Sequence, residues 1–510
     1  MQDATPPPRR LERFAEAAFA LLVAAGALRL LLEDLLQIRA PYQLEFGEGN
    51  ILASSLRLAH GLTPYPLPAA QPPYVLSLYG PLLYAVMSLP LRWLGPSFAL
   101  PRLVILLATL AITVLLVALL RHWTGSWRIA LLFGVFYLSL AEVSLWSATL
   151  RGDPLAIALA LGGLYLFARD ERRWLLAALL FLAAILVKPT VVAAPAAVFL
   201  YLVWRRQWRP ALGFFATMAL LVFGSVAALQ YATQGAFLFH ILGTHPEHYE
   251  LSHLLFLWGQ IGRAQLVPML LVAGFAIAAL RRSEPSLPLL YLLTALLTTA
   301  SAGMAGAASN HFLEWCAALC LGCGLAYHAA GRSPHRRLHV LRSVALLTIT
   351  GCALLYSILI TIAWDDPVEG PLDAIAGRLP YQQRLFPLLV AMPEDCGALQ
   401  RYLAARPGDL MLSENTGAVL LAGKTLLVTD PYGYTQLVRN GGWSAAPVDD
   451  LVRRRAVAAV VLSHDISHLR ALQTDRWPAS TLDALKQNYR LDATFACPNG
   501  RAVYLPLAPR

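Results

Sequence analysis

The chain has 510 residues, of which 57% are hydrophobic and only 14% charged, and its mean hydropathy is +0.56. This composition excludes an ordinary soluble globular protein, because apolar runs of about 20 residues are long enough to cross a bilayer as helices. The net charge of +10 comes with arginines gathered in short segments between apolar runs, which is typical of cytoplasmic loops. We therefore expect a membrane protein with membrane lipid, and no nucleic acid, as a partner.

The sequence predicts a polytopic α-helical membrane protein with about eleven transmembrane helices in residues 1–364. The first apolar run follows Arg9, Arg10 and Arg13, is longer than a signal-peptide core and has no small-x-small cleavage site after it, so we expect it to remain as the first span. The predicted spans are residues 14–32, 99–120, 129–147, 154–168, 174–187, 191–204, 211–232, 265–280, 287–308, 314–330 and 343–364.

The segment Pro81–Leu94 is apolar but short, and it contains Pro90 and Arg92. If it lies along the outer membrane surface instead of spanning, five later basic loops fall on the same side as Arg9 and Arg10, as the positive-inside rule requires. We therefore predict an interfacial helix here, a cytoplasmic N-terminus and a periplasmic first loop, residues 37–98. The basic loops are Arg121 with Arg128, Arg169–Arg173, Arg205–Arg209, Arg281 with Arg282, and Arg332–Arg342.

Two carboxylates, Glu45 and Glu48, follow the first predicted span directly. A charged side chain at the centre of a bilayer costs about 2.5–3.5 kcal/mol, so we expect both to lie in water or in a polar cavity. The next residues, ILASSLRLAHGLTPY, have helical periodicity up to Gly61. A stretch rich in proline and tyrosine follows, and we expect it to cover a substrate cavity with Tyr65, Tyr74 and Tyr79.

The short segment LRGDP places Arg151 and Asp153 between two predicted spans. One interpretation is a mutual ion pair that caps a helix beginning at Asp153 and Pro154. The other is a site in which Arg151 binds phosphate and Asp153 joins the two glutamates. Lys188, in ILVKPT, has the same two interpretations: a side chain that extends to the interface, or a functional cation.

Two further outer loops carry polar side chains. SNHFLEW places Asn310, His311 and Glu314 about one helical turn apart at the start of a span, where they line the cavity or, with Ser309, cap the helix. The loop FHILGTHPEHYELSH lacks a metal signature closed by a third ligand. We favour a loop over the cavity that contributes His248, and the sequence leaves open whether a divalent cation takes part. Its titratable residues are His240, His245, Glu247, His248, Glu250 and His253.

From Asp365 the chain becomes more polar, and residues 365–510 are predicted to form a periplasmic α/β domain. A helical run at Glu394–Ala405 precedes the predicted strands DLMLSEN, AVLLAG, TLLVTD, AVAAVVLSHD and AVYLPL. Cys396 and Cys497 would pair in an oxidising compartment, although the sequence gives no distance between them. The segment DPYGY is interpreted as a turn, and Cys316, Cys320 and Cys323 as helix-packing residues.

Three segments together resemble the bacterial GT-C glycosyltransferases, the superfamily of protein O-mannosyltransferases and lipid A aminoarabinose transferases. They are LEFGEGNILASSLRLAHGLTPY, RGDPLAIALALGGLYLF and ILVKPTVVAAPA, and the resemblance covers most of Tyr42–Trp364. Relatives often carry an Asp–Glu pair in the first loop, where this chain has Gly47–Glu48 preceded by Glu45. Which glutamate takes the leading role is open.

The resemblance implies an inverting transfer of a sugar from a polyprenyl-phosphate donor to an acceptor at the periplasmic face of a bacterial inner membrane. The acceptor hydroxyl needs a general base, for which Glu48, Glu45 and Asp153 are candidates. The leaving lipid phosphate needs fixed cations, and the candidates are Arg151, Lys188, Arg102 and Arg263. A transporter or flippase, or a polymerase or ligase of lipid-linked saccharides, is the alternative; the lack of a repeat favours the enzyme. The sequence does not identify the sugar or whether the acceptor is a glycan, a lipid or a protein.

Overall fold

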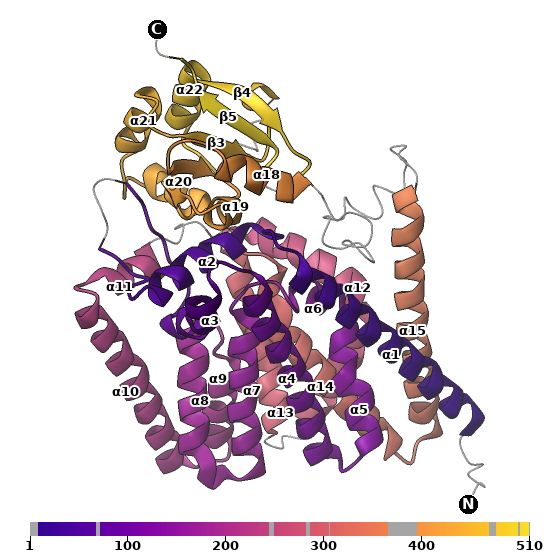
Figure 1. Cartoon of the computed structure of the whole chain (residues 1–510). Helices are drawn as coiled ribbons and strands as arrows, with labels where there is room; N and C mark the ends of the chain where they lie inside the picture. The colour runs from indigo at the N-terminus through magenta and orange to yellow at the C-terminus, as the bar shows by residue number, and fades with distance from the viewer. Residues whose placement is uncertain are drawn as a thin grey trace, which may run out of the picture.

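The computed structural model describes residues 9–67, 72–243, 249–281, 286–304, 306–365, 395–468, 476–497 and 500–508. A helical part is covered at one end by a smaller α/β part formed by the C-terminal residues (Figure 1). The helices of the first part are α1 (Arg9–Arg39), α2 (Phe46–Ala59), α3 (Pro81–Leu94), α4 (Ala99–Thr124), α5 (Trp127–Phe136), α6 (Ala141–Trp146), α7 (Asp153–Arg169), α8 (Trp174–Val187), α9 (Ala193–Trp204), α10 (Trp208–Ala232), α11 (Ala236–Leu238), α12 (Leu251–Arg281), α13 (Leu287–Thr298), α14 (Leu313–Gly331) and α15 (Arg336–Asp365).

Within the described residues, six helical segments are long and apolar enough to cross a membrane. They lie in α1, α4, α10, α12, α14 with the turn before it, and α15. Large apolar side chains are exposed on several of them; Leu21, Leu220 and Phe223 are 72%, 75% and 72% exposed. An apolar surface of this kind on α1 and α10 is what a helix facing lipid requires.

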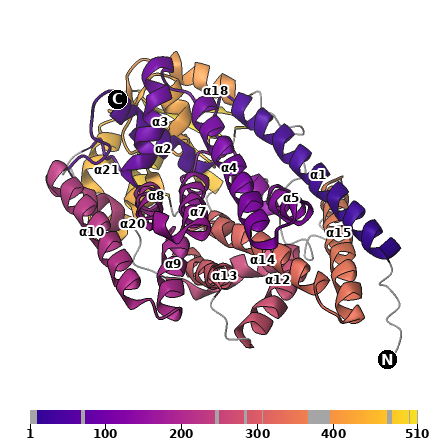
Figure 2. The same cartoon turned by 90° about the horizontal axis from the view of Figure 1, so that it is seen from below.

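The arrangement of helices is clearest from below (Figure 2). α1 packs beside α15 along one edge of the helical part, and α10 lies along the opposite edge. Helices α4, α7, α13 and α14 lie between these edges, and α14 is buried almost throughout. The short turns that complete this part are η1 (Tyr137–Ser139), η2 (Glu171–Arg173), η3 (Phe239–Gly243), η4 (Thr299–Gly303) and η5 (Ser309–Phe312).

Three predicted spans differ in form from the helices observed. Residues 129–147 are divided into α5, η1 and α6, because the backbone at Leu140 is extended. Residues 265–280 belong to the longer α12, which has a non-helical backbone at Gln265 and contains Pro268. Residues 287–308 are helical only to Thr298 and then continue as η4. Pro81–Leu94 forms α3 over the predicted bounds, and its interfacial position stays a prediction.

The C-terminal part is a five-stranded sheet in the order β2-β1-β3-β5-β4. Strands β2, β1 and β3 are parallel, whereas β5 runs antiparallel to both β3 and β4. Met411 pairs with Ala459, and Val461 with Val503, so the central strands are apolar. The strands are β1 (Leu410–Ser413), β2 (Thr425–Leu426), β3 (Ala459–Leu462), β4 (Tyr489–Thr494) and β5 (Ala502–Pro506). The helices are α18 (Asp395–Ala404), α19 (Thr416–Leu421), α20 (Pro431–Arg439), α21 (Ala446–Arg453) and α22 (Ala479–Asn488), with the turn η7 (Ile466–His468).

One predicted strand is wrong. The segment AVLLAG lies mainly in helix α19, because the Asn415 side chain accepts a hydrogen bond from the Ala418 N–H and caps a helix there. Strand β4 was not predicted from the sequence. Cys396 and Cys497, whose pairing the sequence left open, form a disulfide between α18 and the segment after β4.

The first loop and the C-terminal part are joined by hydrogen bonds and by shared apolar cores. Tyr74 N–H donates to the Leu427 carbonyl, and Thr429 N–H donates back to the Tyr74 carbonyl, 2.9 and 3.0 Å apart. Leu76 N–H donates to Thr429 Oγ1 at 3.0 Å. Tyr74 and Leu76 are buried with side chains of the C-terminal sheet. The C-terminal part is therefore fixed on the first loop, directly above the segment that carries Glu45 and Glu48.

Candidate active site

Glu48 and Arg102 form a fully buried ion pair at the start of α2. Arg102 donates from Nε and Nη2 to the Glu48 carboxylate at 2.9 and 2.7 Å. Its remaining N–H groups donate to the carbonyls of Gln37, Ala40 and Tyr42 at 2.7–2.8 Å. These contacts account for all five guanidinium N–H groups. Arg102 thus has no donor left for a phosphate, contrary to the sequence-based expectation, and instead fixes the connection between α1 and α2.

The Glu48 carboxylate also accepts three backbone hydrogen bonds. Leu44 N–H and Glu45 N–H donate to Oε2 at 2.8 and 3.3 Å, and Leu150 N–H donates to Oε1 at 3.1 Å. Burial opposes ionisation of Glu48, but the charge and hydrogen bonds of Arg102, together with the backbone N–H donors, outweigh it and lower the pKa of Glu48. The ionised Glu48 carboxylate therefore links the backbone at Glu45 to the backbone at Leu150, the residue before Arg151.

Arg151 pairs with Glu45 and not with Asp153. Its Nη2 and Nε donate to Glu45 Oε1 and Oε2 at 2.6 and 3.0 Å, a bidentate arrangement. Nη1 donates to the Tyr79 hydroxyl at 2.9 Å, and Tyr65 in turn donates to the Tyr79 carbonyl at 2.6 Å. The side chains of Arg151 and Glu45 are 18% and 14% exposed. Burial opposes the charge of Arg151, but Glu45 and Tyr79 raise its pKa well above the usual value. This pair is accessible to solvent where Glu48 is not.

Asp153, the first residue of α7, makes a second ion pair with Lys188, which ends α8. Lys188 Nζ donates to Asp153 Oδ1 at 2.5 Å, and Asn310 Nδ2 donates to Oδ2 at 2.9 Å. The Lys188 side chain is only 8% exposed, so it does not extend freely to an interface. Asp153 makes no capping hydrogen bond to α7. The helix-capping and snorkelling interpretations are therefore wrong for these two residues.

His311 and Glu314 lie beside this ion pair. His311 Nδ1 is 2.8 Å from the Ser301 hydroxyl, and Glu314 is 5% exposed. These residues line a polar cavity with a volume of about 10 Å³, which is about the space that one water molecule needs. We refer to Asp153, Lys188, Ser301, Asn310, His311 and Glu314 as the Asp153 cluster.

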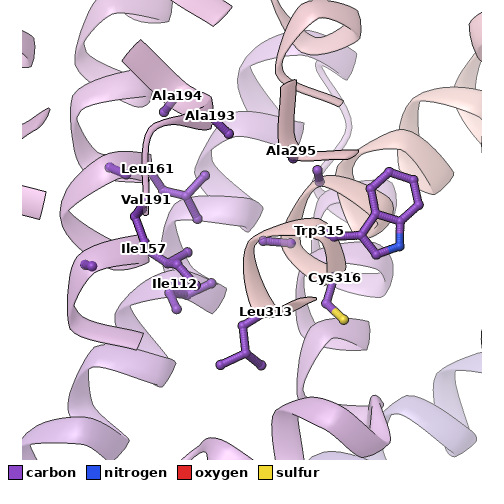
Figure 3. Close-up of a cluster of buried hydrophobic side chains, with 14 of the residues drawn as sticks. Ile112, Ile157, Leu161, Val191, Ala193, Ala194, Ala295, Leu313, Trp315 and Cys316 are labelled. Atoms are coloured by element: carbon purple, nitrogen blue, oxygen red, sulfur yellow. The ribbon is translucent and has the colours of Figure 1, made fainter. Parts of the chain in front are cut away.

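An apolar layer supports the Asp153 cluster (Figure 3). Ile157, one turn after Asp153, and Val191, which follows Lys188 closely, line the cavity and belong to this layer. Leu313 and Trp315 contribute from α14. The side chains labelled in the figure are all buried, so the two charged groups sit on a packed base that limits their movement.

Three predicted site residues lie elsewhere or cannot be placed. Arg263 is exposed on α12, and among the described residues no contact joins it to either ion pair. Tyr74 packs against Tyr434 and Trp443 of the C-terminal part, with ring centroids 5.2 and 4.4 Å apart. His248 lies outside the described residues.

The histidine-rich loop contributes hydrogen bonds where it is described. Burial lowers the pKa of His240, whose Nδ1 accepts from Ser77 N–H while Nε2 donates to the Pro66 carbonyl. His253 Nε2 is 2.9 Å from the Ala307 carbonyl. Within the described residues, no group of three or more His, Cys, Asp or Glu side chains is placed to hold a metal ion.

The structure adds residues that sequence reasoning did not assign to this region. Asp430, in the DPYGY segment, caps α20 by accepting from Gly433 N–H at 3.1 Å. Burial raises the pKa of Asp430, and the Gly433 hydrogen bond and the positive charge of Arg151 partly counter this. Tyr432 lies against Gly306, where a Cβ atom would be 2.8 Å from its ring. The local sequence around Asp430 and Tyr432 indicates only a turn. Sequence reasoning could not assign them to this region, because only the tertiary fold brings them there.

No protein-family model and no curated protein sequence matches the chain. Solved structures do. The ArnT protein of Cupriavidus metallidurans bound to undecaprenyl phosphate matches with a TM-score of 0.60 and 15% identity, over 96% of this chain and 99% of that chain. Its apo form matches with a TM-score of 0.59 and 14% identity, over 95% and 97%.

The Archaeoglobus fulgidus oligosaccharyltransferase, tethered to an acceptor peptide containing the NVT sequon, matches with a TM-score of 0.50 and 11% identity. This match covers 95% of the present chain and 75% of the oligosaccharyltransferase. ArnT and the oligosaccharyltransferase are members of the GT-C superfamily. At these identities the comparison concerns the fold, and it extends over the helical part and the C-terminal part together. The chain therefore has the fold of the GT-C glycosyltransferases, as its sequence motifs predicted.

Proposed function

We propose that the chain is an inverting glycosyltransferase that moves a sugar from a polyprenyl-phosphate donor to an acceptor hydroxyl at the periplasmic face of a bacterial inner membrane. The observation that carries this proposal is the Arg151–Glu45 pair beside the Asp153 cluster, at the end of the apolar helices. A lipid-linked phosphate is delivered at headgroup depth, and in the proposed topology Arg151 and Lys188 lie at that depth. The fold shared with ArnT, which was solved with undecaprenyl phosphate, supports the same donor class.

Glu45 is the proposed general base. It is partly exposed, whereas Glu48 is buried with its carboxylate bound to Arg102 and three backbone N–H groups. A general base must come within hydrogen-bond reach of the acceptor hydroxyl. Asp153, already bound to Lys188 and Asn310, is the second candidate. Glu48 then acts as a positioning residue for the other groups.

In the proposed reaction, Glu45 takes the proton of the acceptor hydroxyl while the hydroxyl oxygen attacks the anomeric carbon of the donor sugar. The bond from that carbon to the phosphate oxygen breaks on the opposite side, so the configuration inverts. The electron pair of that bond leaves with the lipid phosphate. Arg151 and Lys188 stabilise the charge that develops there, because fixed cations cost no reorganisation as it forms. Donor binding would draw Arg151 from Glu45 and free the carboxylate to act.

The proposed topology has about eleven spans, a cytoplasmic N-terminus and a periplasmic C-terminal part. The Cys396–Cys497 disulfide supports an oxidising location for the C-terminal part. The basic loops support the opposite side for the N-terminus. Cysteine labelling from outside intact cells, at Lys424 and at Arg206 each replaced by cysteine, tests this: only the first position is expected to react.

The functional test measures release of polyprenyl phosphate from polyprenyl-phosphate sugars by the purified protein with membrane extract as the acceptor source. We expect Glu45→Gln to abolish release and Arg151→Lys to reduce it at least tenfold, since lysine lacks the bidentate fork. Glu171→Gln is the matched control, because Glu171 makes an exposed pair with Arg205 beyond the far end of α7. Undiminished release by Glu45→Gln and Asp153→Asn would refute the proposal, as would activity only with diphosphate-linked saccharides.

A further inference from the structure

A second cavity, of about 210 Å³, lies between the first loop and the C-terminal part. It is bounded by the last turn of α2, by the proline-rich segment after it and by the indole of Trp443. We call it the Trp443 pocket; its lining residues are Arg57, Pro66, Leu67, Pro73, Tyr74, Val75 and Trp443. Drug-sized ligand sites measure about 300–1,000 Å³, so the volume suits a ligand no larger than about one sugar ring.

Arg57 gives this pocket a positive charge with no carboxylate partner among the described residues. Its Nε donates to the Thr63 carbonyl at 3.1 Å, and the described part of the chain supplies no acceptor for its Nη groups. The neighbouring His240 is neutral, because its Nδ1 accepts from a backbone N–H. A guanidinium whose terminal nitrogens face a cavity is suited to a carboxylate or a phosphate.

The opposite wall of the pocket is aromatic. Trp443 and Tyr74 have ring centroids 4.4 Å apart and planes inclined by 33°. Tyr74 is buried, whereas Trp443 remains partly exposed at the pocket. Trp443 also packs against Tyr434 and Phe239, with ring centroids 6.1 and 5.8 Å apart, so these contacts hold the indole in place. The free part of the indole adds an apolar face on which the C–H groups of a sugar ring can stack.

The position of the pocket relates it to the candidate active site. Glu45 caps the first end of α2, and Arg57 lies in its last turn. At a rise of about 1.5 Å per residue, about 18 Å of helix separate Glu45 from Arg57. α2 lies between the helical part and the C-terminal part (Figure 1). An oligosaccharide of a few units has a length of this order.

We propose that the Trp443 pocket binds an anionic sugar unit of the acceptor, with Arg57 on the acidic group and Trp443 on the ring; its role as an acceptor subsite rests on the proposed function. The occupant is a sugar carrying a carboxylate or a phosphate. A neutral sugar lacks the group that Arg57 recognises, and a free anion lacks the ring.

Binding is tested on the full-length protein in nanodiscs by NMR titration with glucuronic acid, glucose 6-phosphate, glucose and inorganic phosphate. We expect at least one of the two acidic sugars to bind at least tenfold more tightly than glucose and inorganic phosphate, and the tighter of the two identifies the acidic group. Arg57→Gln and Trp443→Ala should each weaken this binding at least tenfold. Arg490→Gln, which removes an exposed arginine from β4, is the charge-matched control and should leave it unchanged.

Three results would overturn the proposal: no binding of either acidic sugar, binding unchanged in Arg57→Gln, or inorganic phosphate binding as tightly as glucose 6-phosphate. The titration needs no donor and is repeated with Glu45→Gln, in which binding should persist. If polyprenyl phosphate is released but neither acidic sugar binds, only the pocket proposal is refuted. Probe binding without release from any donor refutes the proposed function, and with it the acceptor role.

Discussion

The guanidinium of Arg151 lies in the place that a side chain at residue 47 would occupy. A Cβ atom at Gly47 would come within 2.5 Å of Arg151 Cζ, so only glycine leaves room for this contact. The resemblance of the sequence to GT-C glycosyltransferases implies an acidic residue at this place. Here Glu45, two residues earlier, supplies the carboxylate that meets Arg151. Arg151 can therefore hold its position against Glu45 only because residue 47 has no side chain.

Gly47→Ala is expected to displace Arg151 and to reduce the release of polyprenyl phosphate. Overpacking typically costs about 1–3 kcal/mol, and a loss of this size in transition-state binding corresponds to about 5- to 150-fold in rate. Initial rates of release measure the effect. Gly213→Ala in α10 is the control, because nothing lies within 4 Å of a Cβ atom there. Equal rates for Gly47→Ala and wild type would contradict the contact.

Glu48→Gln is expected to destabilise the protein at neutral pH by about 3–5 kcal/mol, the range found when one partner of a buried ion pair is removed. The lowered pKa of Glu48 means that its contribution is present above the unfolded-state pKa of about 4.3 and is lost as pH falls through the lower native value. In nanodiscs, the unfolding temperature of wild type should thus exceed that of Glu48→Gln at pH 7, and this difference should narrow as the pH falls below the unfolded-state pKa. A difference in unfolding temperature that widens as the pH falls would contradict the predicted loss of the Glu48 contribution in acid.

Lys188→Met should lower the unfolding temperature, because it leaves the Asp153 carboxylate buried without its cation. The double variant Asp153→Asn with Lys188→Met should recover most of this loss, since neither charge remains. Release of polyprenyl phosphate should stay abolished in both variants, which separates a stability role from a chemical one. Full activity in the double variant would show that this ion pair only supports the fold.

Cys497→Ser should destabilise the C-terminal part, because the disulfide closes a long loop, with its cysteines 101 residues apart. Removing a disulfide from a small domain typically costs about 2–5 kcal/mol. Limited proteolysis of residues 395–508, with and without reductant, measures the change, and wild type with reductant should match the variant. Cys352→Ser, which removes an exposed free thiol, is the control. Identical proteolysis with and without reductant would contradict the prediction.

Much of the helical part could be predicted from the sequence because long apolar runs carry a strong signal. Pro81–Leu94 forms a helix over the expected bounds. The breaks at Leu140 and after Thr298 could not be predicted, because both fall inside runs that are long and mainly apolar, and they depend on packing. In the C-terminal part, AVLLAG is a short apolar run that suits a strand or a helix equally, and the cap at Asn415 decides it.

The sequence indicated which residues belong to the candidate site more clearly than which of them form ion pairs. The charge pattern indicated that Glu45, Arg151, Asp153 and Lys188 lie on the same side of the membrane. The sequence did not show which carboxylate pairs with which cation. Adjacent charges at Arg151 and Asp153 suggested a local pair, whereas each meets a partner from another segment. Arg102 appeared as a free cation because its acceptors are mostly backbone carbonyls, which no sequence pattern reveals.

The hydrogen bond from Leu76 to Thr429 joins residues 353 positions apart. During synthesis the first loop leaves the ribosome long before its partner strand exists. The cover that the C-terminal part forms over Glu45 and Arg151 is consequently completed only after Thr429 has been made. A nascent or prematurely terminated chain would lack this cover, so the candidate site takes its final form late in synthesis.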